Sequence, residues 1–139
     1  MHDDRRRQLA FHGAVAILLG LLAGFPFAFV ILGQMEGDLR AWRMAHLEGV
    51  LNGLFLWAAA GVGTVLRAGD GAQKLLVRSL IVMAYGNSVA AILGALSGER
   101  GLAPGGSLAN MIVYALFVVA LVAAFVVVGV IAAAARRRS

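Results

Sequence analysis

The chain has 139 residues, of which 61% are hydrophobic and only 14% are charged, and its formal net charge is +5. Soluble domains carry about 25% charged residues, so this composition excludes an ordinary soluble protein. The positive charge would suggest nucleic acid in a soluble protein, but here the Lys and Arg residues flank apolar runs, as they do beside membrane helices. No nucleic-acid partner is therefore expected. The absence of cysteine excludes disulfides, iron–sulfur clusters and thioether-linked haem.

Four apolar runs occupy most of the chain and predict an all-α membrane protein, a single bundle of four transmembrane helices. Each run exceeds the ~20 residues that a helix needs to cross a ~30 Å hydrocarbon layer. Nine of the twelve Lys and Arg residues lie in the two tails and the middle loop, which predicts that both termini are cytoplasmic. The domain covers residues 1–139, with spans at about 9–33, 41–66, 73–97 and 107–135.

The first predicted span is too long for a signal peptide, and we expect it to be retained. Gly20 and Gly24 are four residues apart, a spacing that favours close packing between helices. Pro26 predicts a bend, because proline removes one backbone hydrogen bond. His12 lies near the cytoplasmic end of this span.

The second predicted span places a histidine above a strip without side-chain bulk. At ~100° per residue, His46, Gly49 and Gly53 share one side of the helix, whereas Glu48 and Asn52 share another. Two interpretations stay open from spacing alone. Either His46 holds the iron of a flat prosthetic group that lies along the strip, or it sits in the interfacial layer.

The last two predicted spans add a few polar residues at compatible depths. Asn87 lies near mid-membrane, and Asn110 and Tyr114, four residues apart, share a face near the outer side. A buried amide needs a partner, so these groups and Asn52 either join helices or converge on one outer cavity. Small residues at four-residue spacing in the third span indicate helix packing. After Tyr114 the fourth span is almost wholly aliphatic, which predicts a lipid-facing helix.

His12 and His46 should lie ~20 Å or more apart, at opposite ends of one helical hairpin. We therefore expect His12 to form a helix–helix hydrogen bond, or to reach a site only in another subunit. Three histidines are too few for two bis-histidine haems, and the first span lacks the buried carboxylate that a small drug exporter would need. No nucleophilic triad, phosphate loop or zinc spacing occurs.

Three segments resemble the styrene oxide isomerases, which are small four-helix bacterial membrane enzymes. They are RQLAFHG at residues 7–13, WRMAHLEGVLNG at residues 42–53, and Asn87 followed by Arg-Gly-Leu at residues 100–102. The second segment is the most specific, and the likeness covers the first three spans. It implies a trimer in the bacterial cytoplasmic membrane that binds haem b, whose ferric iron opens a small lipophilic epoxide to a carbonyl compound.

The resemblance implies that His46 ligates the iron and that Asn52 lies beside the substrate. We expect Gly49, Gly53 and Asn87 to contact the haem as well. The family's active-site tyrosine is replaced by Ala91, and Tyr85, on another face, does not substitute for it. Tyr114 is the candidate source of a hydroxyl. Glu48 and a short first loop also differ from the family. The leading hypothesis is a haem b epoxide isomerase; the alternatives are a haem-binding sensor, carrier or electron-transfer protein, and a packing protein without cofactor.

Overall fold

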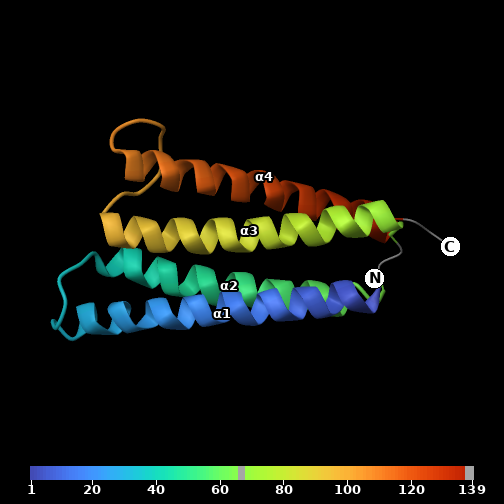
Figure 1. The fold of residues 1–139 in the computed structure, drawn as a ribbon, viewed down its shortest axis with the longest axis horizontal. Helices are drawn as coiled ribbons and strands as arrows, with labels where there is room; N and C mark the ends of the chain where they lie inside the picture. Colours follow the sequence, from blue (N-terminus) through green and yellow to red (C-terminus); the bar gives the residue numbers. More distant parts are fainter. Residues whose placement is uncertain (66–67, 137–139) are drawn as a thin grey trace.

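The computed structural model describes residues 1–65 and 68–136, which form four antiparallel helices (Figure 1). No strand occurs in these ranges, so the all-α prediction is confirmed. Figure 1 shows α1 beside α2 and α3 beside α4, with α2 facing α3. The helices are α1 (Asp3–Ile31), α2 (Leu39–Val62), α3 (Asp70–Ser97) and α4 (Leu108–Arg136). Residue 66, where the second span was predicted to end, and the basic residues Arg67, Arg137 and Arg138 lie outside the described residues.

Helix α1 begins at Asp3, so it includes the arginines that the sequence suggested as a tail. Two acidic residues in its first turn stabilise this end, because carboxylates interact favourably with the helix dipole there. Arg5 pairs with Asp70 and donates to Gln73 Oε1 at 2.9 Å, which joins the starts of α1 and α3. Pro26 does not end the helix, which continues to Ile31.

Helix α2 begins behind a side-chain cap and ends well inside its predicted limit. Asp38 Oδ1 accepts hydrogen bonds from the backbone N–H groups of Arg40 at 2.8 Å and Ala41 at 3.3 Å. Such a cap satisfies donors that have no partner within the helix. The last helical residue is Val62. Helix α3 ends at Ser97 and is followed by the cap residue Gly98, whose φ of +74° suits glycine.

Glycines bring neighbouring helices into backbone contact. A Cβ atom added at Gly20 would lie 2.5 Å from the backbone nitrogen of Val50, and one added at Gly49 would lie 2.4 Å from the Cα atom of Gly20. On the other hairpin, a Cβ atom at Gly86 would lie 3.0 Å from Ala120 Cβ. The predicted packing role of the glycines in the first and third spans is therefore confirmed.

Two apolar clusters hold the four helices together. The larger takes one fully buried residue from each helix: Leu9, Leu56, Leu80 and Val127. The smaller, nearer the other end of the bundle, contains Ala23, Trp42, Ala45 and Ala91. The two clusters position α2 between α1 and α3, and His46 of α2 contacts α1.

Three of the helices, α1, α3 and α4, are long and apolar enough to cross a membrane. Large apolar side chains cover their outer surfaces, for example Phe25 on α1, which is 61% exposed, and Leu121 on α4, which is 57% exposed. Such surfaces suit lipid rather than water. Helix α2, whose first half carries Arg43, His46 and Glu48, is not among these three.

Candidate functional site

The imidazole of His46 is held against α1 by a backbone carbonyl. Its Nδ1 lies 2.8 Å from the carbonyl oxygen of Gly20, and the side chain is half-buried. The ring stacks on Phe27, with centroids 6.2 Å apart and planes inclined by 16°. A Cβ atom at Gly24 would lie 3.1 Å from Nδ1, so a glycine here leaves room for the ring.

The hydrogen bond to Gly20 fixes which nitrogen of His46 carries the proton. A carbonyl oxygen can only accept, so Nδ1 must be the donor, and the neutral ring then keeps a lone pair on Nε2. Metal-binding histidines commonly show this arrangement, in which one ring nitrogen donates to a carbonyl and the other ligates. If a haem were bound, His46 Nε2 would therefore be the atom that could hold its iron. The described residues contain no cluster of three or more His, Asp and Glu residues that would hold a metal ion by itself.

The glycine strip below His46, formed by Gly49 and Gly53, faces helix α1 and not a flat prosthetic group. A Cβ atom at Gly49 would lie 2.4 Å from Gly20 Cα, and one at Gly53 would lie 2.6 Å from the carbonyl oxygen of Gly13. Helix α1 therefore fills the strip within one chain. The prediction that a flat group lies along Gly49 and Gly53 needs correction, because the glycines of α1 match those of α2 and the two backbones close on each other.

Asn52 and Glu48 form a bonded pair on a different face of α2. Asn52 is only 7% exposed, and its Nδ2 lies 2.8 Å from the carbonyl oxygen of Glu48 and 2.8 Å from Glu48 Oε2. The four-residue spacing makes this contact possible on a helix. Asn52 follows His46 by six residues, which places it ~240° around the helix and ~9 Å further along it. His46 and Asn52 thus do not face one ligand within a single chain.

The other predicted site residues do not gather into one outer cavity. Asn110 secures the loop before α4, because its Oδ1 accepts from the Gly101 N–H at 3.0 Å and its Nδ2 donates to the carbonyl oxygens of Ala103 and Gly105. Asn87 on α3 and Tyr114 on α4 are half-buried, and neither side chain makes a hydrogen bond within residues 1–65 and 68–136. Asn110 is a structural residue rather than part of a site.

His12 forms the helix–helix hydrogen bond that the sequence suggested. Its Nδ1 lies 2.9 Å from the hydroxyl oxygen of Tyr85 on α3, and the two rings meet edge to face. The sequence did not single out Tyr85 as the partner. The Gly20 carbonyl lies eight residues beyond His12, which corresponds to ~12 Å along α1, so His12 and His46 occupy different levels of the bundle.

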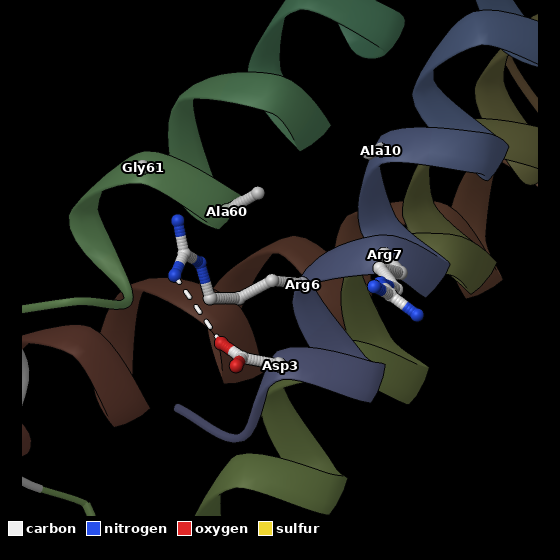
Figure 2. A pocket seen from close by; sticks show the side chains of 6 residues that line it. All are labelled: Asp3, Arg6, Arg7, Ala10, Ala60 and Gly61. Atoms are coloured by element: carbon white, nitrogen blue, oxygen red, sulfur yellow. Dashed lines mark hydrogen bonds and ion pairs between the residues drawn. The ribbon is translucent and has the colours of Figure 1, made fainter.

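Several cavities lie outside these contacts, and two of them are lined partly by charged side chains. One, of about 210 Å³, is lined by residues that include Ala91, Gly94, Met44 and Phe117, with Arg100 from the loop after α3. The larger, of about 360 Å³, lies between the start of α1 and the end of α2 (Figure 2). There Arg6 Nη1 lies 3.4 Å from Asp3 Oδ1, and Arg6 Nε is buried without a hydrogen-bond partner among the described residues. Neither cavity is lined by His46 or Asn52.

The helical bundle and its apolar outer surface define a small all-α membrane protein. The family model for styrene oxide isomerase matches residues 5–136, and the chain belongs to this family. The resemblance drawn from the sequence motifs is thereby confirmed.

A curated relative adds a second kind of isomerisation. The chain is 37% identical over 95 residues to hydroxylaminobenzene mutase HabB of Ectopseudomonas oleovorans. The match covers 68% of this chain and 54% of the relative, so the chain spans about half the length of that protein.

Proposed function

We propose that the protein is a membrane isomerase that binds haem b through His46 Nε2 and acts on a small lipophilic substrate. The observation that carries this proposal is the hydrogen bond from His46 Nδ1 to the Gly20 carbonyl, which leaves Nε2 free to ligate. When bound, ferric haem supplies a Lewis acid for a substrate oxygen. The family suggests an epoxide as substrate, and the curated relative suggests a hydroxylamine.

The residues around His46 prepare it for this role. The Gly20 carbonyl fixes its tautomer, the ring of Phe27 restrains its plane, and Gly24 leaves space beside Nδ1. A hydrogen bond from Nδ1 to a carbonyl also raises the basicity of Nε2 as a ligand. The side chain is half-buried, and α1 already covers the glycine strip within the chain, so a bound haem would be held by His46 rather than by that strip.

Asn52 is the proposed polar contact for the substrate. Isomerisation moves bonds within one molecule, so no redox partner is required: an epoxide breaks one carbon–oxygen bond, shifts a hydrogen to the adjacent carbon and becomes a carbonyl compound. The buried amide of Asn52 can orient a substrate through its Oδ1 oxygen, which accepts from a donor group. Asn87 and Tyr114 remain proposed contacts of the haem and the substrate.

A trimer would explain why His46 and Asn52 point to different faces of α2. If the ligand lies between subunits, His46 of one copy and Asn52 of the next can contact it together. Exposed apolar surfaces on α1 and α4 offer area for such packing and for lipid. We further propose that α2 is the fourth span, that both termini are cytoplasmic and that the membrane is the bacterial cytoplasmic membrane.

A non-enzymatic haem protein is the second candidate, and Ala91 is the observation that favours it. This residue stands where the family resemblance implies a tyrosine, and it is buried beside the cavity of about 210 Å³. A chain that keeps the ligand histidine but lacks this hydroxyl would bind haem as a sensor, carrier or electron-transfer protein. Turnover of an epoxide or a hydroxylamine by the purified protein separates the two functions.

The proposal is tested by the absorption spectrum of protein expressed with ample haem. We expect a Soret band at close to one haem per chain, and loss of most of it in His46→Ala. His12→Ala is the matched control, because His12 is also half-buried on a helix but bonds Tyr85. A full haem content and an unchanged spectrum in His46→Ala would show that the ligand is assigned wrongly.

A further inference from the structure

The pairing of Glu48 with Asn52 decides which side of the amide is available to a ligand. Asn52 Nδ2 approaches two oxygens of Glu48, the backbone carbonyl and the carboxylate Oε2, each at 2.8 Å. An amide NH₂ has two N–H donors, and both are used here. The Oδ1 oxygen of Asn52 makes no hydrogen bond to any residue that the structure describes.

The orientation of this amide follows from chemistry. The backbone carbonyl of Glu48 can only accept a hydrogen bond. The same is true of an ionised carboxylate. If the amide were rotated by 180°, Oδ1 would face two acceptors and both N–H groups would lose their partners. An amide that is 7% exposed cannot recover such a loss from water. Asn52 therefore presents an acceptor, and not a donor, to anything that binds against it.

We propose that Glu48 is a positioning residue that holds Asn52 as an acceptor and thereby selects substrates that carry an N–H or O–H donor, such as N-aryl hydroxylamines, over epoxides. An epoxide oxygen only accepts, so it gains nothing from Asn52 Oδ1. A hydroxylamine offers both an N–H and an O–H group. This inference rests on the proposed function, in which Asn52 contacts the substrate, and it assigns to Glu48 a role in choosing that substrate.

The corresponding reaction needs no external reagent. In an N-aryl hydroxylamine the nitrogen–oxygen bond breaks, a carbon–oxygen bond forms at a ring carbon, and the proton released from that carbon returns to nitrogen. The product is an aminophenol of the same composition. Nitrogen is reduced and the ring carbon is oxidised by the same two electrons, so the electrons balance within one molecule.

The experiment compares ligands that differ in their hydrogen-bond donors. It also compares variants that differ in the contact between residue 48 and the Asn52 amide. The haem-loaded full chain is tested with N-phenylhydroxylamine, with its N,O-dimethyl derivative, which has no donor, and with styrene oxide. Affinities are measured by equilibrium dialysis, and kcat/KM is measured for N-phenylhydroxylamine and styrene oxide. The variants are Glu48→Ala, which frees an N–H of Asn52, and Glu48→Gln, whose side-chain oxygen still accepts from it. Leu47→Ala, at the exposed neighbouring position, is the control.

We expect the unaltered protein, Glu48→Gln and Leu47→Ala to bind N-phenylhydroxylamine at least ~10-fold more tightly than its dimethyl derivative, because a site built for a donor rejects an analogue that lacks it. In Glu48→Ala, Asn52 Nδ2 still donates to the backbone carbonyl of residue 48, but its second N–H becomes available to a ligand that only accepts. The ratio should therefore fall by at least about threefold, and kcat/KM for styrene oxide should rise relative to that for the hydroxylamine. A merely structural role would lower both affinities together and leave their ratio unchanged.

Three results would overturn the inference: equal affinities in the unaltered protein, an unchanged ratio in Glu48→Ala, or a Glu48→Gln protein that behaves like Glu48→Ala. Failure to bind either aryl compound would overturn it as well. The proposed function fails differently, through loss of the Soret band or through absence of turnover of every substrate. Preferential turnover of styrene oxide with intact haem would leave the proposed isomerase standing and remove only the role of Glu48.

Discussion

Replacing Gly49 with Ala should both destabilise the bundle and disturb the histidine. The added Cβ atom would lie 2.4 Å from Gly20 Cα and from Gly20 N, whereas carbon atoms pack at about 3.5–4.0 Å. The α1 backbone would have to withdraw by about 1 Å. Overpacking of this kind costs about 1–3 kcal/mol. Because the obstructing atoms belong to the backbone of α1, a rotamer change cannot relieve the contact.

The same displacement of α1 disturbs His46, the proposed iron ligand. The Gly20 carbonyl accepts from His46 Nδ1 at 2.8 Å, and a withdrawal of about 1 Å would take this contact beyond hydrogen-bond range. Thermal unfolding in detergent should show a lower midpoint for Gly49→Ala, and the purified variant should carry less haem. Gly129→Ala is the control, because nothing lies within 4 Å of its added Cβ and it should be neutral or stabilising by up to about 1 kcal/mol. Equal stability and haem content in the two variants would refute the packing argument.

Three further changes test other contacts. Tyr85→Phe removes the partner of His12 and should lower stability by about 1 kcal/mol in detergent unfolding, without loss of haem. Asn110→Ala removes three hydrogen bonds that hold the loop before α4 and should increase proteolytic cleavage between residues 98 and 107, with unchanged cleavage arguing against the loop role. Ala91→Tyr introduces a hydroxyl beside the cavity of about 210 Å³ and should raise aldehyde formation from styrene oxide by ~10²-fold. No gain would indicate that this position does not face the substrate.

The sequence predicted the fold well because its signals are local. Long apolar runs predict helices, and the observed helices begin and end within a few residues of the expected limits except at Asp3 and Val62. At Asp3, the acidic first turn and the contact from Arg5 to Asp70 extend α1 into the charged tail. That contact joins distant segments and leaves no trace in local composition.

The site was predicted less completely because its contacts cross between helices. The spacing of His46, Gly49 and Gly53 correctly indicated a surface without bulk, but it did not reveal that α1 carries glycines opposite to it. Gly20 and Gly13, which lie opposite Gly49 and Gly53, were the available signal. The partner of His46 is the backbone carbonyl of Gly20. Because every residue has a backbone carbonyl, residue type gives no signal for this contact, and it could not be predicted from sequence.

The most direct test of the central claim is electron paramagnetic resonance of the ferric protein grown with ¹⁵N-labelled histidine. The proposed function predicts hyperfine coupling from the iron to one histidine nitrogen, present in His12→Ala and lost in His46→Ala. Coupling that persists in His46→Ala, or the absence of any histidine coupling in haem-loaded protein, would contradict it.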